Sequence, residues 1–294
     1  MITITVVTIT FQAEKVLQRT LDSVLKQTYS QVEHLIIDGA SKDRTLALAE
    51  AYSRRSEKRA TGHTVCITSE PDKGLYDAMN KGIRQATGDY IVFLNAGDCF
   101  PDEDTLDMVA ASIGDNEDKL PGVLYGDTDI VSDDGSFLRH RRLSPPENLT
   151  WRSFCKGMLV CHQAFYARTD IAKDQFYNTD YHYSADVDWC IRVMKEASKR
   201  HLPLRNVHRV IVNYLEGGMT VKIIGHLSMK DFTSWHPIMV ISLLFLCIFI
   251  LYSGLLKKNF SWRFYYIFAQ SKISDIEKPS MIQIIEGFSI ISLK

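Results

Sequence analysis

The sequence predicts an α/β protein with a mostly parallel central sheet, and three observations support this prediction. Segments typical of strands and of helices alternate through the first hundred of the 294 residues, an order that produces parallel strands joined by right-handed crossovers. Several apolar runs of strand length end in polar turns, the places where open α/β sheets bind ligands. Hydrophobic residues make up 46% of the chain and charged residues 23%, a balance typical of a fold with a substantial core.

Local sequence patterns predict each strand and helix of the N-terminal part of the chain. Residues 2–10 are a continuous run of β-branched residues and predict the first strand. After it, Leu17, Leu21 and Leu25 recur four residues apart and predict an amphipathic helix. The same reasoning gives three further strands, over residues 32–37, 64–68 and 90–94, and two further helices, over about 44–59 and up to residue 85.

The middle of the chain is less regular. Three shorter strands are expected over 123–127, 128–132 and 137–141, the last two joined by an Asp-Asp-Gly turn. A helix is expected over 186–199, where Trp189 lies on an apolar stripe that favours core packing over stacking against a sugar. We expect this folded domain to cover residues 1–224.

Charge and cysteine content narrow the class of protein. The formal net charge of -1 argues against a nucleic-acid binder, which would show a basic excess. The six cysteines contain no C-x-x-C pair, so free thiols in a reducing compartment are expected rather than a zinc site or a disulfide framework. The first residues lack the basic segment of a signal peptide and read as a strand. The domain is therefore expected at the cytoplasmic face of the membrane.

A membrane-associating segment is expected in the tail, residues 225–294. Residues 232–256 contain no Asp, Glu, Lys or Arg, and the apolar segment covers about 236–256, enough to span a bilayer. A buried core helix is the alternative. Lys257 and Lys258 follow the segment, and the positive-inside rule would keep the tail in the cytoplasm. A re-entrant or in-plane helix, or a return crossing through 260–273, would reconcile this with a cytoplasmic domain.

A nucleotide, if one binds, must be held by side chains at strand ends. Neither the G-x-G-x-x-G turn of dinucleotide-binding proteins nor a P-loop is present. Asp38 ends the second strand and could accept a hydrogen bond from a base or a ribose; alternatively, Asp38 and Gly39 only turn the chain. Asp98 follows the fourth strand, where it could meet a metal ion or a phosphate.

Six short motifs occur in the first 220 residues. They are DGASKDRT (38–45), EPDKGLYDAMNKG (70–82), LNAGD (94–98), CHQAF (161–165), ADVDW (185–189) and EGGMT (216–220). In this order they resemble the motifs of family 2 glycosyltransferases with the GT-A fold, a nucleotide-diphospho-sugar transferase fold with a Rossmann-like sheet. The nearest subgroup is similar to enzymes of colanic-acid and related exopolysaccharide biosynthesis.

The resemblance implies a nucleotide-sugar donor and a divalent cation, Mg²⁺ or Mn²⁺, that neutralises the diphosphate leaving group. Asp98 would be the main metal ligand. His162 would contact the metal, the diphosphate or the acceptor, unless it is a core histidine. Asn95 stands where the family usually carries an acidic residue and would ligate the metal or orient the ribose.

The resemblance also implies a nucleotide pocket. Thr8, Asp38 and Asp72 would line it, and Lys73 could approach the base or the phosphates. Gln12 stands where many relatives carry Asn. The pair Gly217-Gly218 would give either a loop that closes over the donor or a simple turn.

The acceptor side requires a general base, because enzymes of this kind invert the anomeric carbon in a single displacement. Asp186 matches the second position of the family's Glu-Asp element, with Ala185 in place of Glu, and Asp188 is the competing candidate. Two residues apart at a helix start, the two carboxylates point in different directions. One can serve catalysis while the other caps the helix or binds the acceptor; a structural role for both is the alternative.

The expected function is therefore membrane-associated, metal-dependent transfer of one sugar to a glycan acceptor. Two further features of the sequence bear on how many sugars are added and on the kind of acceptor. The Q-x-x-R-W element of processive synthases is missing, which favours a single addition. The basic cluster 139–142 is either a solvated surface or a contact for anionic lipid or a lipid-linked diphosphate acceptor. The alternatives are a non-catalytic nucleotide-sugar-binding scaffold in a membrane assembly and a metal-dependent hydrolase of nucleotide sugars.

Overall fold

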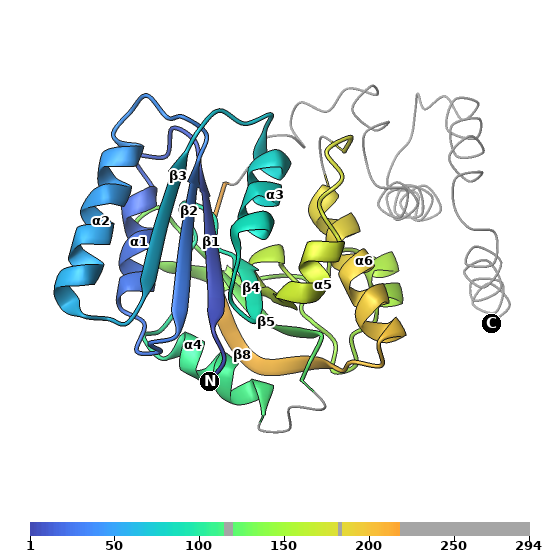
Figure 1. Cartoon of the computed structure of the whole chain (residues 1–294). Helices are drawn as coiled ribbons and strands as arrows, with labels where there is room; N and C mark the ends of the chain where they lie inside the picture. The colour runs from blue at the N-terminus through green and yellow to red at the C-terminus, as the bar shows by residue number, and fades with distance from the viewer. Residues whose placement is uncertain (115–119, 182–183, 218–294) are drawn as a thin grey trace, which may run out of the picture. The chain divides into compact units, whose positions relative to one another are not determined.

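The computed structural model describes residues 1–114, 120–181 and 184–217 (Figure 1). The predicted apolar segment over about 236–256, the rest of the tail and the second glycine of the 217–218 pair lie outside the described residues. Among the described residues, no helix has both the length and the apolar character needed to cross a membrane.

One sheet organises the described residues, with the strand order β3-β2-β1-β4-β7-β5-β6, and β8 paired to β5. The prediction of a mostly parallel sheet is confirmed: β3, β2, β1 and β4 are all parallel neighbours, and antiparallel pairs occur in the second half of the sheet. The pairs β4–β7, β7–β5 and β5–β6 are antiparallel, whereas β5 and β8 are parallel. The strands are β1 Ile4–Thr10, β2 Val32–Asp38, β3 Thr64–Ser69, β4 Tyr90–Phe93, β5 Val123–Val131, β6 Phe137–His140, β7 Phe165–Arg168 and β8 Leu204–Leu215.

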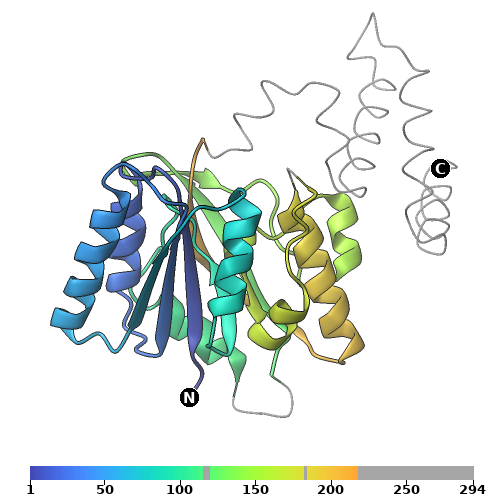
Figure 2. The ribbon, with the colours of Figure 1, turned by 45° about the horizontal axis from the view of Figure 1, so that its top comes forward.

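Helices cover both faces of the parallel strands. Figures 1 and 2 show α1 and α2 together on one face and α3 on the other. The α1 leucines pack against Ile36 of β2 and Tyr52 of α2 in one apolar cluster. On the opposite face, α3 lies so close to the sheet that a Cβ on Gly82 would be 2.5 Å from Val7 Cγ1. The helices are α1 Leu17–Leu25, α2 Thr45–Arg59, α3 Leu75–Gln85, α4 Thr105–Ile113, α5 Thr169–Asp174 and α6 Ala185–Lys199, with the short 3-10 helices η2 Trp151–Lys156 and η3 His162–Ala164.

A buried carboxylate joins the amino ends of the strands. Glu33 of β2 is 7% exposed, and it accepts hydrogen bonds from Thr5 Oγ1 (2.6 Å), Thr87 Oγ1 (2.6 Å) and the Thr87 backbone N–H (2.8 Å). Burial acts to raise the pKa of Glu33, but these hydrogen bonds outweigh it and hold the pKa below its ordinary value. Glu33 thereby ties β1 and β2 to the turn that leads into β4.

In the second half of the domain, the strands and helices of the structure differ from those predicted. Residues 123–132 were expected as two strands, but β5 is one strand whose register against β8 shifts on both sides of Asp127. These irregularities break the alternation of inward and outward residues, which explains the mistaken division. The elements α4, β7 and β8 were not predicted at all.

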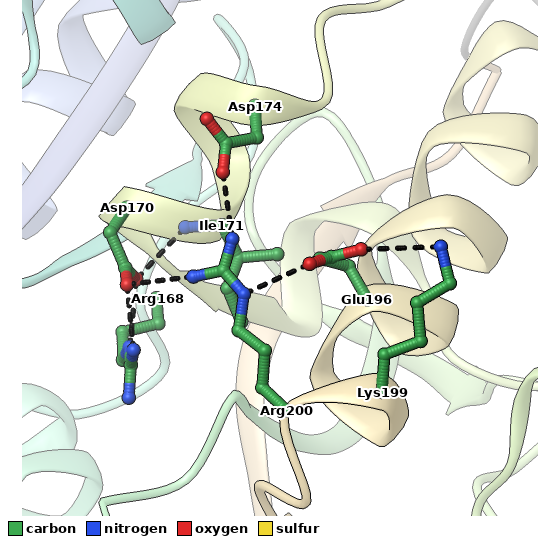
Figure 3. A network of polar contacts seen from close by, with 7 residues as sticks. All are labelled: Arg168, Asp170, Ile171, Asp174, Glu196, Lys199 and Arg200. Atoms are coloured by element: carbon green, nitrogen blue, oxygen red, sulfur yellow. Dashed lines mark hydrogen bonds and ion pairs between the residues drawn. The ribbon is translucent and has the colours of Figure 1, made fainter.

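A charged network fastens α5 to α6 (Figure 3). Arg200, just after α6, lies 3.0 Å from Asp170 and 2.7 Å from Asp174, both on α5, and 3.0 Å from Glu196 on α6. Arg168, at the end of β7, contacts Asp170 through two nitrogens. The network therefore fixes the C-terminal end of α6 against the sheet and α5, while the other end of α6 carries candidate site residues.

Candidate functional site

Asp38, at the end of β2, is enclosed by hydroxyl groups from three segments. Its Oδ1 accepts hydrogen bonds from Thr10 Oγ1 (3.1 Å) and Ser41 Oγ (2.5 Å), and its Oδ2 accepts them from Ser69 Oγ (2.6 Å) and the Ser41 backbone N–H (3.0 Å). The residue is 1% exposed. This geometry corresponds to the alternative in which Asp38 organises the turn, and its contact with a base or ribose stays a prediction.

Asp72 and Phe11 lie beside the turn that Asp38 organises. A Cβ on Gly39 would be 2.5 Å from Asp72 Oδ2 and 3.2 Å from Phe11 Cδ2, so only glycine fits there without a shift. Phe11 follows β1 and is 65% exposed, an unusual position for a large aromatic ring. Sequence reasoning gave Phe11 no role. Lys73 is exposed beside Asp72, so the two predicted pocket residues and the unpredicted ring occupy one edge of the sheet.

The backbone around this edge adopts left-handed conformations at residues other than glycine. Gln12 has φ 51° and Ala40 has φ 59°, and the Gln12 backbone N–H donates to Ser41 Oγ at 2.8 Å. Asn tolerates this region better than most residues. The conformation at residue 12 would therefore strain Asn less than it strains Gln12.

Thr8 does not face this edge. Its side chain is completely buried, and its Oγ1 lies 2.9 Å from His34 Nε2, while His34 Nδ1 lies 2.6 Å from the Tyr52 hydroxyl. Burial, reinforced by nearby His63, lowers the pKa of His34 to about 3, so the ring is neutral. The structure thus places Thr8 in a polar chain that joins the sheet to α2, and no contact supports its predicted place in a nucleotide pocket.

Asn95 and Asp98 share the turn after β4, closed by a hydrogen bond from the Asp98 N–H to the Asn95 carbonyl (3.0 Å). Asp98 is 4% exposed. Its Oδ2 accepts from Gln163 Nε2 (2.9 Å) and its Oδ1 from the Leu215 backbone N–H (3.0 Å). Burial raises the pKa of Asp98 to about 7, against these two hydrogen bonds and the charge of Arg19. Asp98 therefore joins β4, η3 and β8 at the carboxyl ends of the strands.

The oxygen atoms of this turn suit a hard divalent cation. Asn95 Oδ1 is buried and has no hydrogen-bond partner in the part of the chain that the structure describes, and the Asp98 carboxylate lies in the same turn. Carboxylate and amide oxygens are the ligands that Mg²⁺ and Mn²⁺ prefer. No cluster of three or more His, Cys, Asp or Glu side chains that could hold a metal occurs within residues 1–114, 120–181 and 184–217. The turn fits a cation that takes its remaining ligands from phosphate oxygens and water.

His162 lies in a cluster of aromatic rings. Its ring stacks on Phe93 (5.1 Å between centroids), packs edge-on against Trp189 and forms a hydrogen bond through Nε2 with the Tyr177 hydroxyl. Burial lowers the pKa of His162 to about 3. This geometry corresponds to the core-histidine alternative, and a role as metal ligand stays a prediction that no contact supports. Trp189 is likewise fully buried, in agreement with the core-packing interpretation.

The two candidate bases on α6 have different surroundings. Asp188 is 8% exposed and forms an ion pair with Arg192 (2.7 Å between Oδ2 and Nε). Asp186 is half-buried, and burial raises the pKa of its carboxyl group, while nearby polar groups, Tyr76 among them, act in the opposite direction. The two carboxylates have different neighbours, as their spacing predicts, and Asp186 forms no ion pair with an arginine of the described residues.

Tyr214 of β8 connects the two halves of the site electrostatically. Burial raises the pKa of Tyr214, and the carboxylates of Asp98 and Asp186 raise it further. Tyr76 on α3 and Tyr214 both interact with Asp186, and sequence reasoning singled out neither. The EPDKGLYDAMNKG motif contains Tyr76, but spacing alone could not show that it meets α6.

The basic cluster 139–142 is largely engaged with protein groups. Arg139 pairs with Glu216 (2.9 Å) and His140 with Asp129 (2.6 Å). Arg141 donates to the backbone carbonyls of Leu143, Met158 and Leu159. These contacts stabilise the hairpin and its neighbours, and a contact of this cluster with lipid or with a lipid-linked acceptor stays a prediction.

Comparison with known proteins decides the family. The family model described as "Glycosyl transferase family 2" matches residues 5–176. The chain belongs to glycosyl transferase family 2. It is therefore a glycosyltransferase, and the sheet described above is similar to those of GT-A enzymes.

The chain is similar to glycosyltransferases whose names refer to biosynthesis. It is 34% identical over 234 residues to the "PGL/p-HBAD biosynthesis glycosyltransferase" of Mycobacterium bovis (strain BCG / Pasteur 1173P2), covering 78% of this chain and 81% of the relative. It is 30% identical to the "Amylovoran biosynthesis glycosyltransferase AmsB" of Erwinia amylovora, covering 71% and 70%.

Solved structures show the same fold at low sequence identity. S. aureus TarS 1-349, crystallised in complex with UDP-GlcNAc, superposes with a TM-score of 0.62 at 18% identity, over 82% of this chain and 66% of that one. The same protein in complex with UDP gives a TM-score of 0.60, and this chain spans 65% of its length.

Proposed function

We propose that this family 2 glycosyltransferase moves a single sugar from a nucleotide-sugar donor to a hydroxyl group of a glycan acceptor, with inversion at the anomeric carbon. Asp186 is proposed as the general base. The observation that carries this assignment is the contrast on α6: Arg192 forms an ion pair with Asp188 at 2.7 Å, whereas Asp186 forms no ion pair among the described residues, and burial raises its pKa. A carboxylate with a raised pKa is a better proton acceptor.

The donor is proposed to lie across the carboxyl ends of β1, β2 and β3. Phe11 is exposed there beside Asp72, and a base that stacks on an aromatic ring gains affinity without a sequence-specific contact. Asp72, Lys73 and, after a local rearrangement, Asp38 are proposed to contact the nucleotide. The similarity to TarS, which binds UDP and UDP-GlcNAc, supports a nucleotide-sugar donor.

In the proposed reaction, the acceptor hydroxyl oxygen forms a bond to the anomeric carbon while the bond from that carbon to the diphosphate oxygen breaks. The electron pair of the broken bond leaves with the nucleoside diphosphate, and the hydroxyl proton passes to the Asp186 carboxylate. Asp98 and Asn95 would hold a divalent cation, which neutralises the charge of the leaving diphosphate when bound.

The acceptor is proposed to be a lipid-linked glycan at the cytoplasmic face of the membrane. Support comes from the apolar segment over about 236–256 and from the names of the relatives, which refer to PGL/p-HBAD biosynthesis and to amylovoran biosynthesis. Removal of the residues after 224 is expected to release the protein from membranes. Unchanged partitioning of a folded truncated protein would contradict the attachment.

The base assignment is tested with Asp186→Asn and Asp188→Asn. Purified variants are assayed for transfer from UDP-, GDP- and dTDP-sugars with and without Mn²⁺, and donor binding is measured by calorimetry. Asp186→Asn is expected to lose at least about a hundredfold in kcat, in line with general-base catalysis, while it keeps donor affinity. Asp188→Asn is expected to lose stability more than turnover. Full activity of Asp186→Asn would refute the assignment, and sugar release without acceptor would indicate a hydrolase.

A further inference from the structure

Gln163 of η3 is a buried glutamine whose side-chain amide is engaged at both ends. The residue is 7% exposed. Its Nε2 donates to Asp98 Oδ2 at 2.9 Å, and its Oε1 accepts a hydrogen bond from the Cys161 thiol at 3.0 Å. Turning the amide over would set its oxygen against the carboxylate and leave the thiol without an acceptor. These two hydrogen bonds therefore fix which end of the amide faces Asp98.

The backbone of the turn that carries Asp98 is held by α1 and β8. Cys99 and Asn213 of β8 exchange two backbone hydrogen bonds, at 3.0 and 2.8 Å. The Gly97 N–H donates to Thr20 Oγ1 on α1 at 2.8 Å, and Gly97 has φ 106°, a conformation that favours glycine. The main chain of the turn is thus fixed without η3, and what η3 contributes is a contact with the carboxylate.

The Asp98 carboxylate meets one donor on each of its oxygens. Gln163 donates to Oδ2, and the Leu215 backbone N–H donates to Oδ1 at 3.0 Å. The terminal torsion of an aspartate has a broad preference, so two donors from different elements are needed to hold the plane of the carboxylate. A carboxylate has about four acceptor sites on its two oxygens, and each oxygen therefore keeps capacity for a cation.

We propose that Gln163 is a positioning residue for the divalent cation of the transfer reaction, which holds the Asp98 carboxylate in the orientation that binds the cation. This inference rests on the proposed function, in which Asp98 and Asn95 hold that cation. Gln163 acts through Asp98, because its own oxygen, the atom that could ligate a metal, faces the Cys161 thiol. Partners that orient a metal ligand typically contribute about 10- to 100-fold to metal affinity.

The inference gives the CHQAF motif a part in the candidate site. Sequence reasoning considered only His162 of this motif as a site residue, and the structure packs its ring against Phe93 and Trp189. The residue of the motif that contacts Asp98 is Gln163. Two residues before it, Cys161 fixes the orientation of its amide.

The test is Gln163→Met, which keeps the length of the side chain and removes both polar groups. Mn²⁺ binding to the purified protein is measured by electron paramagnetic resonance, with Mn²⁺ alone and with added UDP, GDP or dTDP. The dissociation constant for Mn²⁺ should rise by about 10- to 100-fold. Asp98→Ala, which removes the ligand itself, should abolish the binding.

Gln27→Met is the matched control, because Gln27 is a buried glutamine of the same kind on the opposite side of the turn's chemistry. It is 5% exposed, donates from Nε2 to the Asp102 carbonyl at 2.7 Å and accepts at Oε1 from the Leu106 N–H at 3.0 Å. Its loss should lower Tm, because two buried hydrogen bonds disappear. The dissociation constant for Mn²⁺ should stay within about twofold of the wild type, since Gln27 contacts neither Asp98 nor Asn95 through a hydrogen bond.

Cys161 supplies a second measurement, which does not require Gln163→Met to fold. Cys161→Ala removes the donor to Gln163 Oε1, so the amide can turn over. This variant should weaken Mn²⁺ binding by about 2- to 5-fold, the effect of one weak hydrogen bond. Cys161→Ser keeps a donor at this position and should restore the dissociation constant to within about twofold of the wild type.

The outcomes separate this inference from the proposed function. If the wild type binds Mn²⁺ and Asp98→Ala does not, while a folded Gln163→Met keeps the wild-type dissociation constant, the positioning role is refuted and the cation site stands. An equal loss of affinity in Gln27→Met would also overturn the inference, because the loss would then follow from destabilisation. If Gln163→Met does not fold, wild-type affinity in Cys161→Ala refutes it. If neither the wild type alone nor its mixtures with nucleotides bind Mn²⁺, the proposed cation itself fails, and the inference fails with it.

Discussion

Glu33 offers a quantitative test of how the sheet is held together. Glu33→Gln keeps the shape of the side chain but replaces one acceptor oxygen with an amide nitrogen. The wild-type carboxylate accepts three short hydrogen bonds, two from Thr87 and one from Thr5, at 2.6 to 2.8 Å. A hydrogen bond to a charged group contributes about 1.5–3 kcal/mol and a neutral one about 1. Each bond is then weakened by about 0.5–2 kcal/mol, and three such bonds predict a loss of about 1.5–6 kcal/mol.

The assay is thermal unfolding followed by circular dichroism at pH 7. For a domain of this size, a loss of this magnitude lowers Tm by roughly 3–24 °C. Glu103→Gln is the control, because its side chain is exposed, and it should leave Tm unchanged. A Tm for Glu33→Gln within about 2 °C of the wild type would refute the reasoning, since such a shift corresponds to less than about 1 kcal/mol.

Acid titration gives an independent check of the same group. The folded-state pKa of Glu33 lies below the ordinary value of 4.5, so its contribution is complete above that value and is lost as the pH falls through the folded-state pKa. The Tm difference between the wild type and Glu33→Gln should therefore be constant near neutral pH and shrink on acidification below about 4.5. A difference that does not change with pH would contradict a charged Glu33.

Three further predictions concern the edge of the sheet and α6. Gln12→Asn should raise Tm by about 1–3 °C, because the φ of 51° costs Gln more than Asn; Gln31→Asn is the control, and no gain would argue against strain at residue 12. Phe11→Ala should weaken nucleotide binding about 5- to 100-fold by calorimetry, whereas Phe137→Ala, which removes another exposed ring, should not; equal affinities would exclude base stacking on Phe11. Arg200→Gln should cost about 1–2 kcal/mol at low salt and less at high salt, while Lys199→Gln, which removes one exposed contact of 3.5 Å, should cost almost nothing; equal losses would show that the network in Figure 3 does not act as a unit.

The first half of the fold was predictable because each of its signals is local. Leucines four residues apart on α1 and β-branched runs in β1 and β2 are regular patterns that packing then reinforces, as the shared apolar cluster shows. The second half depends on pairing between distant segments. β7 has only four residues, Phe165–Arg168, and inserts antiparallel between β4 and β5. Strands this short carry little periodicity, and the bulges in β5 weaken what remains.

The candidate site was predictable as a set of strand ends but not as a set of contacts. The positions of Asp98 and Asp186 followed from motifs, yet whether a neighbour neutralises a carboxylate depends on atoms far away in the sequence. Arg192 is four residues from Asp188, and that pairing could have been foreseen from helical spacing. Tyr76 is more than a hundred positions from Asp186, and the burial of Thr8 depends on His34 and α2. Phe11 lacked any signal beyond its place after the first strand.

The hydrogen bond from the Leu215 backbone to Asp98 spans 117 positions along the chain, which has a consequence for synthesis. During vectorial translation, the parallel strands β1 to β4 emerge first and can pair while the rest of the chain is still inside the ribosome. Asp98 gains its second donor only after β8 has emerged, and Asp186 arrives with α6 shortly before. The nascent polypeptide thus acquires its candidate chemistry last, and a fragment that stops at residue 176, where the family match ends, would carry Asp98 with one of its two donors missing and no Asp186.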